Sequence, residues 1–303
     1  MSDMLVCDLH NDILTSGLSD DGIKAYLDNA LKYCEILTMA VWTSESKPSL
    51  LSLREIFAKY SEYAKVKEGR GRVVFAVEDM GFLEQSSNDK AQMTNLDEFL
   101  KLPMVYAGLV WNNGNQFGGG AFSDTGLTAA GKAAVRLFNS SGIALDFAHM
   151  NKKTFYQAAD LYKKPILCSH TCFQACVDNN APLGHIARAR NLDDGQVKTI
   201  VQSGGLIGLT FVATFLNGTP DCSSDDIVRH IDWFVQKYGY KNLAIGTDYF
   251  GTKELPRDVM DYKDFNVIAD KLLRLGYNAE AVSGIFSGNF QRFLYSFKVK
   301  KTL

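Results

Sequence analysis

Eight short apolar runs, each followed by a helical pattern, recur along this 303-residue chain and leave few folds open to it. Most of the runs are continuously apolar, which is typical of parallel strands covered on both faces. They occupy residues 4–9, 35–42, 72–78, 104–111, 142–148, 164–169, 205–212 and 242–247. Because a strand and a helix alternate eight times over this length, we predict an α/β fold, a (β/α)₈ TIM-type barrel. A doubly wound sheet is the main alternative, since periodicity does not show closure.

Two of the intervening segments carry clear helix signals. Thr128 is predicted to cap a helix that ends near Gly142, and its apolar stripe is Ala130, Ala133, Ala134, Leu137 and Phe138. Ser224 is predicted to cap another, in which Ile227, Ile231, Phe234 and Val235 face inward. No linker, low-complexity segment or exact repeat interrupts the chain, so we predict one domain over residues 1–303.

Composition excludes several classes of protein. A formal net charge of -2 gives no reason to expect a nucleic-acid partner. No apolar run reaches the length of a membrane-spanning helix, and the N-terminus lacks the pattern of a secretory signal. The six cysteines are interpreted as reduced core thiols, because a chain of this size needs no disulfide staples. We therefore predict a cytoplasmic protein without a membrane partner.

Side chains that commonly ligate metals follow five of the eight runs. In a TIM barrel the functional groups sit at the C-terminal strand ends, which meet at one edge. A single histidine there could be an ordinary buried residue satisfied by hydrogen bonds. Six such groups at one edge instead predict a metal site, and they are His10, Asp12, Glu78, His149, His170 and Asp248.

The first run, "VCDLHNDIL" (6–14), places Asp8, His10 and Asp12 at alternate positions. In a regular strand all three side chains would leave on one face. His10 and Asp12 are the predicted ligands, whereas Asp8 could orient a ligand imidazole from behind.

The predicted donors are nitrogen and oxygen atoms, which suit zinc or another borderline divalent ion. Three histidines, two aspartates and a glutamate exceed what one tetrahedral ion needs. Two ions that share a bridging carboxylate would use them all. Such a pair can hold a hydroxide at neutral pH and polarise a carbonyl.

Motifs along nearly the whole chain resemble those of the membrane (renal-type) dipeptidase family of the amidohydrolase superfamily. The interval of 21 residues between His149 and His170 also fits that family. The motifs are "DLHND" (8–12), "AVED" (76–79), "GLTAAGKAAVRLFNSSGIALDFAH" (126–149), "PILCSH" (165–170), "RNLDD" (190–194), "GGLIGLTF" (204–211), "AIGTDYFG" (244–251) and "SGNFQRFL" (287–294).

The resemblance implies a zinc-dependent dipeptidase with a metal-bridging hydroxide, small dipeptides as substrates, and a homodimer. It implies that His10 and Asp12 bind one ion, that His149 and His170 bind the other, and that Glu78 bridges them. Asp248 would be the catalytic acid and base beside the hydroxide.

Arg190 would pair with the substrate's C-terminal carboxylate, a task suited to its planar fork. The alternative for Arg190 is a solvated position at a helix start, near Asp193 and Asp194.

The segment "LVWNNGNQFGGG" (109–120) departs from the family pattern. Animal members carry a histidine there that contacts the scissile carbonyl, and this chain has Trp111 or Asn112. We predict that both bind substrate, Asn112 as an amide donor to the oxyanion or Trp111 as a pocket wall. The glycines at 118–120 are predicted to form a flexible lid or a substrate loop. Phe250 replaces the second acid of the family's usual "DFDG".

Residues 171–189 form an apparent insertion relative to the family, in which His185 is predicted to lie at the surface. His230 is predicted to be structural. Two other functions stay open: a related amidohydrolase that acts on N-acyl amino acids or lactams, and a non-catalytic barrel that binds a metal or ligand.

Overall fold

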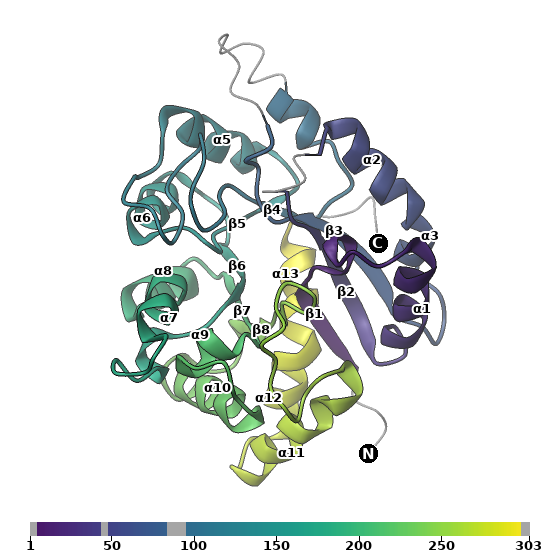
Figure 1. Cartoon of the computed structure of the whole chain (residues 1–303), viewed down its shortest axis with the longest axis vertical. Coiled ribbons are helices and arrows are strands. Elements are labelled where there is room, and N and C mark those ends of the chain that lie inside the picture. Colours follow the sequence, from purple (N-terminus) through teal and green to yellow (C-terminus); the bar gives the residue numbers. More distant parts are fainter. Residues whose placement is uncertain (1–4, 44–47, 84–94, 298–303) are drawn as a thin grey trace.

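The computed structural model describes residues 5–43, 48–83 and 95–297. Within these ranges, eight parallel strands form a closed barrel in chain order, with β8 paired to β1 (Figure 1). The closure confirms the predicted (β/α)₈ barrel and excludes the doubly wound sheet. The strands are β1 (Val6–Asn11), β2 (Cys34–Val41), β3 (Arg72–Val77), β4 (Tyr106–Gly108), β5 (Ala144–Asp146), β6 (Leu167–Thr171), β7 (Leu206–Leu209) and β8 (Leu243–Ile245).

Helices surround the barrel, as Figure 1 shows. The α-helices are α1 (Asp20–Ala30), α2 (Leu50–Lys59), α3 (Ser61–Ala64), α5 (Ala129–Ser140), α6 (Lys152–Leu161), α7 (Gly184–Arg190), α8 (Asp194–Gln202), α9 (Ala213–Asn217), α10 (Ser224–Tyr238), α11 (Phe265–Arg274), α12 (Ala279–Ser283) and α13 (Asn289–Ser296). Short turns of 3₁₀ helix are η1 (Ile13–Thr15), η2 (Gln174–Cys176) and η3 (Tyr262–Asp264), and η4 (Gly284–Gly288) is a π-helical turn.

The two predicted helices exist, but one cap is shifted by a residue. Thr128 caps α5, and its side chain accepts a hydrogen bond from the Gly131 amide. Ser223, not Ser224, caps α10, because the Ser223 hydroxyl accepts from the backbone while Asp226 accepts from the Ser223 amide. The Ser224 hydroxyl donates instead to Asp258, at 2.5 Å.

Two apolar cores hold the barrel together. The larger one lies between the strands and the surrounding helices. The smaller one fills the barrel interior, where residues such as Cys7 and Leu206 contact Phe290, Phe293 and Leu294 of α13. Figure 1 places α13 behind the strands, near the barrel axis. Thus α13 covers the N-terminal ends of the strands, whereas the polar groups gather at the opposite end.

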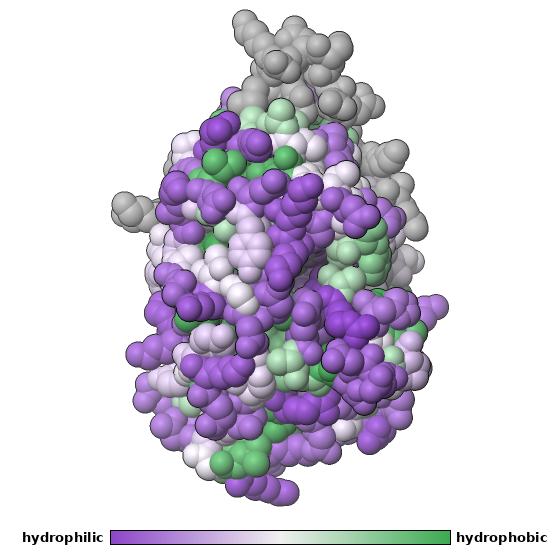
Figure 2. Space-filling model, turned by 90° about the vertical axis from the view of Figure 1, so that its left-hand side faces the viewer, coloured by the Kyte–Doolittle hydropathy of each residue, from purple (hydrophilic) through white to green (hydrophobic). Residues whose placement is uncertain are grey.

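The surface and the thiols agree with the composition. Figure 2 shows a mostly hydrophilic face on which apolar side chains form small, separate groups. No helix in the described ranges is both long enough and apolar enough to cross a membrane. All six cysteines lie in those ranges as free thiols, and all except the half-buried Cys176 are buried.

Candidate metal centre

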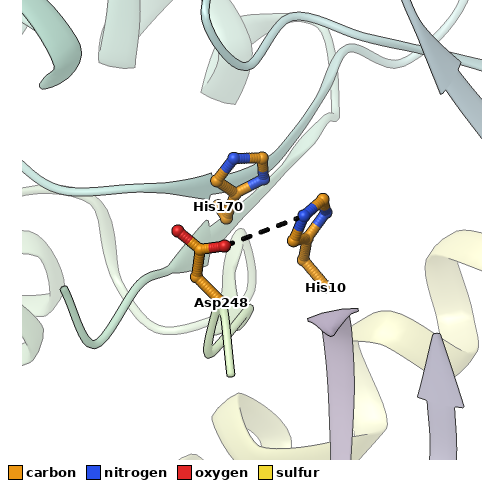
Figure 3. A group of neighbouring side chains, drawn as sticks. All are labelled: His10, His170 and Asp248. Carbon is orange, nitrogen blue, oxygen red and sulfur yellow. Dashed lines mark ion pairs between the residues drawn. The ribbon is translucent and has the colours of Figure 1, made fainter. Parts of the chain in front are cut away.

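The six predicted donors meet at the C-terminal end of the barrel, and each is at most 8% exposed. They form three overlapping groups of three, in which the potential ligand atoms lie within 4.8 Å of one another. One group joins His10 of β1, His170 of β6 and Asp248 after β8, whose side chains point toward one another in Figure 3. The others are Glu78, His149 and His170, and His10, Asp12 and Glu78.

Asp8 does not share a face with His10 and Asp12, so the expected alternation along β1 is wrong. A register shift between Asp8 and Asn11 interrupts the pairing of β1 with β2, and such an irregularity re-aims the side chains that follow it. The Asp8 carboxylate accepts hydrogen bonds from Thr247 and from the Tyr262 hydroxyl. It also accepts from the backbone amide of His10. Asp8 therefore ties β1 to the segment after β8 and orients no imidazole.

Tyr106 orients the His10 imidazole, a role that the sequence did not reveal. The Tyr106 hydroxyl lies 2.8 Å from His10 Nδ1 and donates its own proton to the Leu9 carbonyl, also at 2.8 Å. Nδ1 must therefore be the donor to the hydroxyl, and Nε2 points into the site. Nε2 is buried and has no hydrogen-bond partner in the described residues, as is also true of Asp12 Oδ1.

His149 and His170 are held in the same way, by Asn112 in the loop after β4 and by Ser169, which precedes His170 on β6. His149 Nδ1 donates to Asn112 Oδ1 at 2.8 Å. His170 Nδ1 lies 2.8 Å from the Ser169 hydroxyl, whose proton goes to Asp146 at 2.5 Å. Both imidazoles therefore carry their proton on Nδ1, which leaves a lone pair on each Nε2.

The two lone pairs face each other, and this arrangement fits a bound cation. His149 Nε2 and His170 Nε2 are 2.7 Å apart, and Glu78 Oε1 lies 2.9 Å from the first and 3.6 Å from the second. Burial, with nearby Arg190 and His10, lowers the pKa of both histidines well below 6.5, so both are neutral. Neutral imidazole nitrogens and carboxylate oxygens are the donors that zinc and similar ions take.

The buried carboxylates of the cluster repel one another, so a bound positive charge would stabilise their ionised forms. Burial and the neighbouring Asp12 raise the pKa of Glu78 well above its usual range and that of Asp248 to about 8. Burial opposes the charged form of His10, but Asp12, Glu78 and Asp248 raise its pKa to about 10. A divalent cation would offset the repulsion among these acids.

The backbone at the site is held in an uncommon conformation. Among the described residues, the non-glycine positions with positive φ are His149 (64°), Asp248 (65°) and Phe250 (70°). Such conformations cost free energy and persist where the surroundings enforce them, commonly at functional sites. Gly251 supports the same arrangement, since a Cβ there would lie 2.3 Å from both Asp12 Oδ2 and Asp248 Oδ1.

A pocket of about 430 Å³ opens over the cluster. Trp42 and Trp111 form one wall, with ring centroids 5.2 Å apart, and Asn112 lies beside them. Leu183 and Ile186 also line the pocket, so the insertion supplies part of its wall. His185, which lies in the same insertion and was predicted to lie at the surface, is exposed on α7.

Arg190 lies in this pocket, and its alternative as a solvated residue at a helix start is wrong. It is the last residue of α7 and is 5% exposed. Its guanidinium carbon lies 4.9 Å over the Phe215 ring, and Nη2 lies 3.4 Å from His149 Nε2. The next helix, α8, is capped by Asp193, which pairs with Lys152 at the surface.

Two other predictions have different outcomes. The glycines at 118–120 are buried rather than a lid, and a Cβ on Gly120 would lie 1.8 Å from the Trp111 carbonyl. They let the loop pack closely behind Trp111 and Asn112. His230 is structural, as predicted, because its Nδ1 accepts from the Phe173 amide and its Nε2 contacts the Leu216 carbonyl at 2.8 Å.

The barrel and its clustered nitrogen and oxygen donors define a metal-dependent hydrolase of the TIM-barrel type. The model of the membrane dipeptidase family (peptidase family M19) matches residues 54–302, and the chain belongs to that family. Membership places it among metallo-dipeptidases, which hydrolyse peptide bonds.

The chain is also similar to curated relatives and to solved structures. An uncharacterized protein from the pqqA 5' region of Klebsiella pneumoniae is 31% identical over 212 residues, 66% of this chain and 74% of that one. An uncharacterized dipeptidase of Schizosaccharomyces pombe is 24% identical over 206 residues, 65% of this chain and 47% of that one. The chain thus spans about half the length of that yeast relative.

Among solved structures, a metallopeptidase from Rhodobacter sphaeroides, liganded with a phosphinate mimic of L-Ala-D-Ala, superposes with a TM-score of 0.80. It is 19% identical, and the match covers 98% of this chain and 100% of that one. An amidohydrolase from Pseudomonas aeruginosa has a TM-score of 0.74 at 18% identity, with 97% of each chain covered. At this identity the two structures show a shared fold.

Proposed function

We propose that this protein is a dipeptidase that hydrolyses small dipeptides with two divalent metal ions, zinc being the ion that its donors favour. The observation that carries the proposal is the pair of lone pairs on His149 and His170, which face each other at 2.7 Å beside Glu78. Two neutral imidazoles whose lone pairs face each other repel, and a cation held by both would offset that repulsion. The second ion is supported by His10 Nε2 and Asp12 Oδ1, both buried without a hydrogen-bond partner in the described residues.

His10 and Asp12 would hold one ion, and His149 and His170 the other. Glu78 suits a bridge, since its Oε1 lies 3.9 Å from His10 Nε2 as well as close to both other histidines. When bound, the two ions would activate a water molecule at neutral pH and polarise the scissile carbonyl.

Asp248 would manage the protons of the reaction. Its Oδ1 lies 3.9 Å from His10 Nε2, within the cluster, where a carboxylate can take up and release a proton beside the reacting groups. From this position it would take a proton and pass it to the leaving amine. Its backbone, at φ 65°, aims the carboxylate into the site.

Arg190 would bind the C-terminal carboxylate of the substrate. Stacking on Phe215 orients the guanidinium, and its buried Nε has no hydrogen-bond partner in the described residues. A buried N–H without an acceptor is costly, and a substrate carboxylate would supply that acceptor. Trp111 and Asn112 line the pocket, where they would contact the substrate. The cytoplasmic location and the homodimer stay predictions.

The test is hydrolysis by zinc-loaded protein of a library of L,L and L,D dipeptides, each also offered N-acetylated, with products identified by mass spectrometry. We expect cleavage of the free dipeptides. Cleavage of the acetylated members alone would instead assign the protein to N-acyl amino acid hydrolysis. If neither set is cleaved while metal analysis shows two bound ions, the proposal fails in favour of a binding protein.

A further inference from the structure

Glu254 is a charged side chain of the pocket for which the proposed reaction has no use. It lies in the segment after β8, and it lines the same pocket as Arg190. The other carboxylates there, Asp12, Glu78 and Asp248, all belong to the metal cluster. Among the described residues, Glu254 forms no ion pair. The Glu254 carboxylate is therefore a half-buried negative charge that a ligand in the pocket can reach.

Three hydrogen bonds hold Glu254 in place. Its backbone amide donates to the Thr252 hydroxyl at 3.0 Å, and its carbonyl accepts from the Ala213 amide at 2.9 Å. The Thr214 hydroxyl donates to Oε2 at 2.5 Å. The second oxygen, Oε1, has no hydrogen-bond or ion-pair partner within the described part of the chain and is free to accept from a ligand. A carboxylate fixed in this way is preorganised to bind a cation, because little rotamer freedom remains to be lost.

The helix α9 joins Glu254 to Arg190 along one wall of the pocket. The Thr214 hydroxyl contacts Glu254, and the Arg190 guanidinium stacks on the ring of the next residue, Phe215. A substrate whose carboxylate pairs with Arg190 has its C-terminal residue on this wall. In that orientation the side chain of the C-terminal residue would extend along α9 toward Glu254.

We infer that Glu254 forms a subsite for a cationic side chain on the C-terminal residue of the substrate. Dipeptides that end in lysine, ornithine or arginine are therefore preferred over those that end in a neutral residue of the same length. The inference rests on the proposed dipeptidase function and names its substrate class.

The test compares kcat/KM for Ala-Lys and Ala-norleucine, which differ in the terminal ammonium group, with zinc-loaded wild type and Glu254→Gln. We expect the wild type to prefer Ala-Lys about fivefold, which is the upper end of what a partly exposed charge pair contributes. Glu254→Gln should abolish the preference. Raising the salt concentration should also reduce it in the wild type, because the carboxylate is half-exposed.

Lys253→Gln is the matched control, since Lys253 is the exposed neighbour in the same segment. It should keep the Ala-Lys preference within about twofold, because a charge that does not contact the substrate is screened more strongly than one in direct contact. A comparable change in both variants would overturn the subsite.

Two further outcomes would also overturn the inference. Equal cleavage of Ala-Lys and Ala-norleucine by the wild type would show that no cationic subsite exists. An equal loss on both substrates in Glu254→Gln would assign the carboxylate to the substrate's amino group. If no dipeptide is cleaved, Ala-Ala included, the proposed function fails instead. Calorimetric binding of Ala-Lys and Ala-norleucine to both proteins then decides the subsite without turnover.

Discussion

At the scale of single residues, the contacts of the two ring nitrogens separate the metal-centre histidines from the structural one. Both nitrogens of His230 are occupied by backbone groups. In His10, His149 and His170 a side chain takes Nδ1, and Nε2 points into the cluster. The residue type is the same in all four positions. The partner of Nδ1 therefore decides which of them can ligate a metal.

Asn112→Ala should weaken zinc binding by roughly 10- to 100-fold, because it removes the acceptor that holds the His149 ring. The affinity would be measured by competition with a chromophoric chelator. Asn113→Ala, at the exposed neighbouring position, should keep the wild-type affinity. If Asn112→Ala binds zinc normally but turns over slowly, the amide acts on the substrate instead.

Asp248→Asn should lower kcat by at least about 100-fold, since the amide neither takes nor delivers the proton. Metal content, measured by elemental analysis, should stay at the wild-type level because His10, Asp12, Glu78, His149 and His170 remain. Asp221→Asn, on the exposed surface, is the control for loss of one charge. Undiminished turnover in Asp248→Asn would remove this residue from the chemistry.

Arg190→Ala should raise KM for dipeptides by about 10- to 100-fold but change little for dipeptide amides, which lack the carboxylate. Steady-state kinetics on matched acids and amides would show the difference. Arg188→Ala, two residues earlier on α7 and less buried, is the matched control. An equal effect of Arg190→Ala on both substrate types would limit Arg190 to a structural role.

At the scale of elements, the site depends on where each strand stops and how the chain leaves it. The register shift in β1 turns Asp8 away from the cluster while His10 and Asp12 enter it. After β5 and β8, His149 and Asp248 take positive φ angles that direct their side chains inward. These local departures from regular strand geometry assemble the donors.

His230 on α10 makes the stability of this part of the fold depend on pH. Burial lowers its pKa from 6.5 to about 4. Between these values the unfolded chain takes up a proton and the folded protein does not, so stability falls as the pH falls through this window. This histidine alone should account for about 2 kcal/mol of the loss between about pH 7.5 and about pH 5.

Urea unfolding of wild type and His230→Gln at the two pH values would measure this contribution. Glutamine keeps a donor for the Leu216 carbonyl but does not titrate, so its drop in unfolding free energy should be smaller by that amount. His185→Gln, exposed on α7, should show the wild-type drop. An equal drop in His230→Gln would show that this histidine does not control the acid sensitivity.

At the scale of the whole molecule, metal binding and folding should be coupled. The donors come from five separate strand ends around the closed barrel, so a bound ion cross-links segments far apart in the sequence. A ligand at about 1,000 times its dissociation constant stabilises the folded state by about 4 kcal/mol. Chelation should therefore lower Tm in calorimetry, and zinc should restore it.

The double variant His149→Ala, His170→Ala should lose most of this dependence of Tm on zinc, whereas His185→Ala should keep it. If saturating zinc does not change the Tm of the wild type, the cluster is not a metal site.

Much of the fold was predictable because its signals are local. A continuous apolar run of strand length, followed by a capped amphipathic helix, specifies one β/α unit within about 30 residues. Eight such units leave a barrel as the simplest arrangement. The donors were predictable for the same reason, since each one lies at the end of a strand or just after it. The cap of α10 was misplaced by one residue because Ser223 and Ser224 offer the same hydroxyl.

By itself, the sequence determined the β/α order, the type of each donor and the strand end at which it lies, because these depend on neighbouring residues. The tertiary structure decided which ring nitrogens are spare, that Asp8 faces away, that Arg190 is buried and that Glu254 shares its pocket. Each of these depends on contacts between distant segments, such as His10 with Tyr106, 96 positions apart. Local pattern does not encode such contacts, which exist once the closed barrel brings the strand ends together.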